Sequence, residues 1–173
     1  MGTYIPIATV TVSSGGAANI EFTSIPATYT DLLVKASLRD NRTDSPVTDT
    51  VITFNSSGSG YSIKMFYGDA SSVGGASTSG AVYIAGQYQN TNQTTSNTFS
   101  NTEIYIPNYT SSNNKSISVD AVTESTSNPI YASIVAGLWA NSSAISSIKL
   151  APMYGSLSYV QYSTATLYGI KNS

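Results

Sequence analysis

The sequence of 173 residues contains no cysteine and no histidine, and only 9% of its residues are charged. Without cysteine the chain can form neither a disulfide nor a thiolate metal site. Without histidine it lacks the usual proton carrier near neutral pH and the commonest ligand of zinc, iron and copper. We therefore expect no cofactor and no metal site.

Basic residues and long apolar runs are also scarce. The seven lysines and arginines are spread along a chain of net charge −2. They form no basic cluster of the kind that binds nucleic acid. No stretch approaches the roughly 20 apolar residues of a membrane span. The N-terminal residues lack the basic start and apolar block of a signal peptide. We expect neither a nucleic-acid nor a membrane partner, and synthesis without secretion.

What the sequence does contain is apolar residues in strict alternation. Hydrophobic residues make up 40% of the chain, which favours a folded protein over a disordered one. Leu32, Val34, Ala36 and Leu38 alternate with a mostly polar row, as expected for one face of a β-strand. In 130–139 one row includes Ile134 and Leu138, and the other includes Val135 and Trp139. No window shows a sustained helical period.

This alternation predicts an all-β fold in a single domain spanning 1–173. Serine-, glycine- and asparagine-rich turns separate the alternating segments. Short strands at this spacing predict an antiparallel two-sheet sandwich of about 8–10 strands with jelly-roll topology. Segment 61–67 fits either a short strand or a helical turn, and 68–80 is expected to be the longest loop. The predicted strands are 5–13, 17–24, 31–39, 48–55, 81–88, 99–107, 115–123, 130–139, 145–151 and 158–170.

Charge is densest in segment 39–46, with one further aspartate just beyond it. Asp40, Asp44 and Asp49 could supply oxygen ligands to calcium, but their spacing does not match an EF-hand loop. We favour a structural loop in which Arg39 and Arg42 pair with Asp40 and Asp44.

The remaining carboxylates form no catalytic motif. Glycosidase chemistry needs two carboxyl groups across a cleft, and no spacing in the sequence indicates such a pair. Neither a Gly-x-Ser-x-Gly elbow nor a phosphate-binding loop is present. We expect no enzymatic activity. The carboxylates considered are Glu21, Asp31, Glu103, Asp120 and Glu124.

Aromatic residues are the more informative side chains. Tyrosine combines a stiff apolar ring with a polar hydroxyl, which suits protein interfaces and stacking on sugars. Many of the 13 tyrosines fall in predicted strands or beside their ends, and about half are expected to do no more than pack at sheet edges. The candidate contact residues for a protein or glycan partner are Tyr83, Tyr88, Tyr105, Tyr109, Tyr131 and Trp139.

Four short segments carry a family resemblance. Segment 22–34 (FTSIPATYTDLLV) is followed by Ser37-Leu38-Arg39, then by 145–150 (ISSIKL) and by 165–170 (ATLYGI). In this order they resemble small β-sandwich proteins encoded among the virion genes of tailed phages. Each motif is also good strand–turn–strand sequence, with Pro26 ending one strand and Leu32 beginning the next.

The resemblance implies a structural role in a phage virion. Capsid decoration is the favoured role, because the chain begins directly on a predicted strand with no coiled coil or shaft before it. The implied partners are the major capsid protein and copies of the chain itself, with a trimer expected. The implied location is the capsid surface, after synthesis in the host cytoplasm. A tail-fibre or receptor-binding module that recognises host glycan is the alternative.

Overall fold

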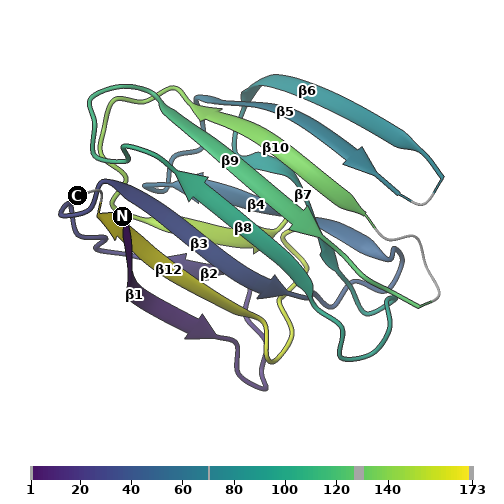
Figure 1. The fold of residues 1–173 in the computed structure, drawn as a ribbon. Helices are drawn as coiled ribbons and strands as arrows, with labels where there is room; N and C mark the ends of the chain where they lie inside the picture. Colours follow the sequence, from purple (N-terminus) through teal and green to yellow (C-terminus); the bar gives the residue numbers. More distant parts are fainter. Residues whose placement is uncertain (1, 70, 127–130, 172–173) are drawn as a thin grey trace.

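The computed structural model describes residues 2–69, 71–126 and 131–171. This part of the chain holds twelve β-strands and no helix (Figure 1). The all-β prediction is therefore confirmed. The strands are β1 (Thr3–Thr11), β2 (Ile20–Phe22), β3 (Asp31–Leu38), β4 (Val47–Phe54), β5 (Tyr61–Gly68), β6 (Val73–Ala81), β7 (Ile84–Asn90), β8 (Ser100–Ile106), β9 (Lys115–Val122), β10 (Ala132–Trp139), β11 (Ile148–Pro152) and β12 (Thr164–Lys171).

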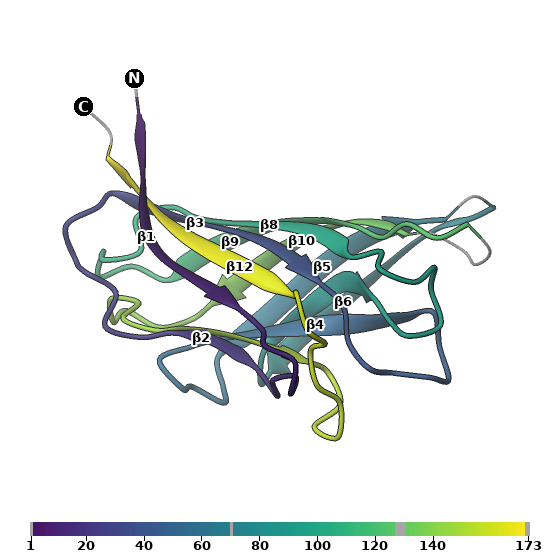
Figure 2. The same ribbon diagram turned by 90° about the horizontal axis from the view of Figure 1, so that it is seen from below.

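The strands form two antiparallel sheets that pack face to face. One sheet has eight strands in the order β1-β12-β3-β8-β9-β10-β5-β6, and the other has four in the order β2-β11-β4-β7. Figure 2 shows the larger sheet as one layer and the smaller sheet beneath it. Leu32, Val34 and Leu38 of β3 point into the space between the layers together with Ile52 and Phe54 of β4, and all five are buried. The predicted two-sheet sandwich is confirmed.

Eight of the strands have the connectivity of a jelly roll. Strands from the two halves of the chain pair along a long two-stranded ribbon. Its pairs are β1–β12, β2–β11, β3–β8 and β4–β7. The ribbon is wrapped so that β12 also pairs with β3, and β11 with β4. This places β1-β12-β3-β8 in one sheet and β2-β11-β4-β7 in the other, which is the jelly-roll arrangement of two Greek keys. We call these eight strands the body.

The other four strands enlarge only one of the two sheets. β5 and β6 arise in the connection between β4 and β7, and β9 and β10 arise in the connection between β8 and β11. They continue the larger sheet beyond β8 in the order β9-β10-β5-β6. We call them the extension. Figure 1 shows them on the side of the larger sheet opposite β1.

The extension contains the two segments for which the sequence-based expectation was incomplete or wrong. Segment 61–67, left open between strand and helical turn, lies in β5. Segment 68–80, expected to be a loop, instead contains most of β6, so the strand total exceeds the predicted 8–10. β6 lacks an apolar alternation, and its strand geometry comes from its register with β5. Gly74 assists this pairing, because a Cβ atom there would lie 2.6 Å from the Tyr67 ring.

Three aromatic rings connect the extension to the body. Trp139 of β10 packs against Phe54 of β4 and stacks on Tyr61 of β5, with ring centroids 5.6 and 6.2 Å apart respectively. The Phe54 amide donates a hydrogen bond of 2.9 Å to the Tyr61 hydroxyl. All three rings are buried, so β10 and β5 of the extension share the core of the body.

Candidate interaction surface

Strand β10 shows how the two faces of the extension differ. Ser133, Val135 and Trp139 point toward the smaller sheet and are buried, whereas Ile134 and Leu138 point outward. Both rows are apolar enough to form a core, but only one can face the smaller sheet. The outer row therefore leaves large hydrophobic side chains in contact with solvent.

These outward side chains form a continuous apolar patch across four strands. Ile134 of β10 lies opposite Phe66 of β5, and they are 61% and 70% exposed. In the next row Ala132 lies between Val122 of β9 and Gly68 of β5, and Gly68 is paired with Val73 of β6. Val122 and Val73 are 49% and 86% exposed. We call Phe66, Val73, Val122 and Ile134 the apolar patch; they line a shallow hollow.

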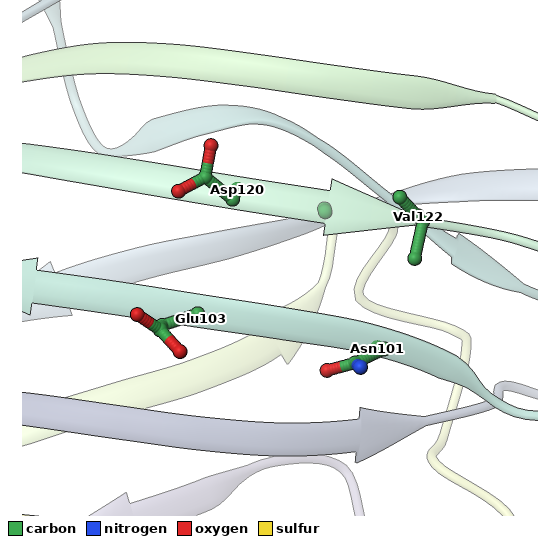
Figure 3. A pocket seen from close by; sticks show the side chains of 5 residues that line it. Asn101, Glu103, Asp120 and Val122 are labelled. Carbon is green, nitrogen blue, oxygen red and sulfur yellow. The ribbon is translucent and has the colours of Figure 1, made fainter.

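Charged side chains border the patch on the same outer face. Glu103 of β8 lies opposite Asp120 of β9, and Figure 3 shows the two carboxylates on the same side of these neighbouring strands. Glu103 also forms an ion pair with Lys35 of β3, with Nζ 2.9 Å from Oε2. Lys64 of β5 lies on the other side of Ile134, one row away.

The Glu103–Asp120 pair was considered above as possible hydrolase carboxylates. A glycosidase places its two carboxyl groups on opposite sides of the scissile bond. Here both groups project from adjacent strands of one sheet face, side by side in a shallow open hollow (Figure 3). Glu103 is moreover held by the Lys35 ammonium. The pair lacks the geometry of a general acid facing a nucleophile or base.

Two of the six aromatic contact candidates are part of the core. Tyr109 is 0% exposed and Trp139 is 1% exposed, so neither can stack on a ligand at the surface. The Tyr109 hydroxyl donates a hydrogen bond to the Pro26 carbonyl, which connects the segment after β8 to the one after β2. Predicting these two residues as surface contacts was wrong because both rows of β10 are apolar and because Tyr109, unlike the rest of the mostly exposed segment 107–114, turns into the core.

Two other candidates meet in a tyrosine cluster. The rings of Tyr88 of β7 and Tyr131, which precedes β10, have centroids 4.9 Å apart. Tyr67 of β5 completes the cluster at 5.9 and 6.3 Å from them. All three are half-buried. Burial and the nearby Asp49 carboxylate raise the pKa of Tyr88 to about 12, so its hydroxyl stays protonated and can donate a hydrogen bond.

The last two candidates have separate positions. Tyr83 is half-buried and packs against the core between β6 and β7. Tyr105 lies on the outer face of β8, where its hydroxyl donates a 2.9 Å hydrogen bond to Oδ2 of Asp31. In the described part of the chain, neither Tyr83 nor Tyr105 makes a ring contact with the tyrosine cluster.

The charged loop after β3 contains one ion pair on its surface. Nε of Arg42 lies 2.6 Å from Oδ1 of Asp44. Arg39 instead is buried and donates to backbone carbonyls of the β7–β8 connection, at 2.8 Å for Thr95 and 2.9 Å for Thr98. Arg39 therefore holds a neighbouring loop in place and does not pair with Asp40, contrary to the sequence-based expectation.

Asp40 points into the polar end of the core. Its Oδ2 atom accepts a 2.6 Å hydrogen bond from Nε2 of Gln89, and its Oδ1 atom accepts one of 2.9 Å from the Arg42 amide. Gln89 in turn accepts from the Thr50 hydroxyl. Because Asp40 is fully buried, desolvation raises the pKa of its carboxyl. The side chain is a structural acid at the end of the body.

The described residues contain neither a cluster of metal ligands nor a helix that could span a membrane. Within 2–69, 71–126 and 131–171 no three acidic side chains converge to hold a metal ion. Asp40, Asp44 and Asp49 thus do not form the calcium site considered above. The same ranges contain no helix that is long and apolar enough to cross a membrane.

No family model, curated protein or solved structure matches this chain. Its function must therefore be argued from the geometry of its own surfaces.

None of the four patch residues was predicted from the sequence as a contact, and no strand was assigned to three residues of the candidate surface: Phe66, Val73 and Tyr67. All three lie in β5 and β6, the segments not assigned as strands. A signal for β5 was present, since Tyr61, Ile63 and Met65 alternate with Ser62 and Lys64. That alternation continues to Phe66 on the outer row and Tyr67 on the inner row. No comparable signal exists for Val73, whose neighbours are glycine, serine and alanine.

Proposed function

We propose that this protein is a structural component of a tailed-phage virion, a capsid decoration protein that binds and stabilises the shell of major capsid protein. The observation that carries the proposal is the exposed apolar patch on a jelly-roll protein, a surface suited to assembly with capsid subunits or with copies of the chain itself. Monomeric proteins seldom leave such a patch in water unless it binds a partner. Jelly-roll domains occur among viral capsid proteins and lectins, and the sequence motifs resemble phage virion proteins.

Low charge and a broad, flat outer face also support assembly over solution chemistry. The chain carries 16 charged side chains, nine acidic and seven basic, in 173 residues, and a surface with so little repulsion favours association. The proposed partners are major capsid subunits and copies of the same chain. The proposed location is the capsid surface, after synthesis in the host cytoplasm.

Cryo-electron microscopy of purified phage particles tests this proposal. We expect density for the jelly roll at regular positions over the capsid shell, and particles without the protein should lose DNA at a lower temperature. Density confined to the tail would overturn the decoration role. A matched particle preparation from phage that lacks the gene identifies which density belongs to this chain.

The tyrosine cluster supports one alternative, a receptor-binding module for host glycan. Tyr67, Tyr88 and Tyr131 offer aromatic surface beside the Asp49 carboxylate, and sugar sites combine these two features. Binding to a glycan panel that is lost in Tyr131→Ala would favour this function. The control is Tyr162→Ala, which removes a 66% exposed tyrosine outside the cluster. Absence of binding to any glycan would count against it.

A further inference from the structure

We infer that the outer face of the extension is a two-fold interface with a second copy of this chain. The inference takes from the proposed function only the expectation of self-association. It names the surface and the symmetry that this association uses. The major capsid protein would then bind elsewhere on the molecule.

The centre of the proposed interface is the Ile134–Phe66 pair. These side chains lie opposite each other on β10 and β5, and more than half of each is exposed. Covering two large apolar side chains removes apolar surface from water, which favours association. The register places no charged residue between them, so the centre can exclude water when a second sheet covers it.

The charges around this centre are arranged asymmetrically. Asp120 of β9 lies directly beside Ile134 on one side. Lys64 of β5 lies on the other side, opposite Ala136 and two residues before Phe66. The ion pairs found in the described residues are Lys35–Glu103 and Arg42–Asp44, so both Asp120 and Lys64 remain available to a partner.

This asymmetry makes the face complementary to itself. A two-fold axis that runs parallel to the sheet, midway between the two outer faces and between the two charges, places Lys64 of one copy opposite Asp120 of the other. The reciprocal contact follows from the symmetry, since an isologous interface repeats each contact twice. The two ion pairs would then flank a central cluster of Ile134 and Phe66 from both copies. Charge complementarity of this kind selects a second copy over an unrelated partner.

The size and shape of the face also fit sheet-on-sheet packing. Four strands about 4.8 Å apart, each with about eight residues rising 3.3 Å, present roughly 500 Å². With β8 and β3, which carry Glu103 and Lys35 on the same face, the area reaches roughly 750 Å². A stable interface buries about 800 Å² per partner. Two such faces stack as sheets do in a sandwich, and the symmetry gives a dimer where the sequence suggested a trimer.

A charge-reversal experiment tests the interface with the purified full chain. Sedimentation velocity over a concentration series should show a monomer–dimer equilibrium. Lys64→Asp and Asp120→Lys should each weaken the dimer by about tenfold or more, because each creates two like-charge contacts. The double variant should recover the affinity of the unchanged protein to within about threefold. Lys149→Asp, which makes the same charge change on β11 of the other sheet, is the control and should not affect the dimer.

Phe66→Ser provides a second test that does not depend on charge. It should also weaken the dimer, and circular dichroism should show an unchanged β-sheet spectrum. The inference is overturned by a double variant as dissociated as the single ones, by a trimer that none of the changes affects, or by a chain that is monomeric throughout. A face that binds major capsid protein and no second copy also overturns it. Because these measurements need no particles, their failure leaves the virion proposal standing for the microscopy to decide.

Discussion

The body and the extension use the same antiparallel pairing but bury it differently. In the body both sheets cover each other, and the central strand β3 is buried along almost its whole length. In the extension β10 and β5 still reach the smaller sheet through Trp139 and Met65, whereas β6 is exposed over most of its length. The inner rows of β9, β10 and β5 therefore add to the core, whereas β6 and the outer rows add little to it. The extension adds a surface with unsatisfied apolar area, which is what binding requires.

The four sheet edges show the same contrast. β1 carries Pro6 and a register shift beside it, and β2 has only three residues. β7 has an irregular register with β4. Prolines, bulges and short strands protect edges from unwanted pairing. β6 has neither a charge nor a proline, and its register shift lies near its end, so Val73 to Ser79 pair with β5 without interruption. The extension therefore has the longest regular edge of the molecule.

The comparison is tested most severely at the residue that joins the two regions. Trp139→Ala should lower the free energy of unfolding by about 3–5 kcal/mol, because it leaves a large cavity between Phe54 and Tyr61. The neighbouring Leu138→Ala on the outer face should cost about 1 kcal/mol or less. Urea denaturation of both variants measures the difference. Equal losses would show that the outer row is as important to folding as the inner one.

A matched pair of isoleucines tests the contrast between the buried and exposed faces. Ile104→Thr in β8 of the body should cost about 2 kcal/mol, because it places a hydroxyl in a site that is 0% exposed. Ile134→Thr in β10 keeps a β-branched side chain on an exposed face and should change stability by no more than about 0.5 kcal/mol. Thermal denaturation at a concentration too low for association provides the measurement. A large loss for Ile134→Thr would mean that the outer face is covered within the monomer.

The smallest expected effects concern two aspartates whose contributions to folding stability change with pH in opposite directions. Burial raises the pKa of Asp40 in the body, so its neutral form favours the folded state, and this contribution decreases as the pH rises through the raised pKa. Asp40→Asn should therefore stabilise the protein near pH 7 by on the order of 1 kcal/mol. The new amide can keep its hydrogen bonds if the Gln89 amide turns over, since the Thr50 hydroxyl can accept as well as donate.

Asp69, in the turn between β5 and β6, provides the comparison. Hydrogen bonds donated by Ser71 and Ser72 lower the pKa of its carboxyl. Its contribution to stability is present above its unfolded pKa and disappears as the pH falls through the lowered one. Asp69→Asn should thus weaken the protein near neutral pH and have no effect in strong acid. Unfolding curves between pH 3 and pH 7 would contradict this assignment if the two variants changed in the same direction.

Most strands of the body, and β9 of the extension, could be predicted from the sequence because their apolar and polar residues alternate. Leu32 to Leu38 in β3 and Ile117 to Ala121 in β9 show one apolar and one polar row, and the structure buries the apolar row in each. Ten predicted segments correspond to strands of the structure. The jelly-roll topology was predicted only from the number and spacing of the strands. The pairing of distant strands such as β1 and β12 leaves no local pattern in the sequence from which it could be predicted.

The interaction surface could not be predicted, for two physical reasons. In β10 both rows are apolar, so the alternation cannot say whether Ile134 or Trp139 faces the smaller sheet. That choice depends on what lies beneath the strand, where Ile84 fits against Gly137 with no room for a Cβ atom. In β6 the strand geometry is imposed by β5, because segment 74–80 is mostly glycine, alanine and serine, and only Thr78 favours a strand.

The pairing of β1 with β12 has a consequence for the order in which the chain folds. Thr3 lies opposite Lys171, and β2 likewise waits for β11. The body can close only after almost the whole chain has left the ribosome, and such distant pairing makes folding slow. The pairs β5–β6 and β9–β10 join segments that are close in sequence, so their hairpins can form while synthesis continues. During that interval the inner row of β10, which is later covered by the smaller sheet, is as exposed as the outer row, so newly made chains can associate through either face.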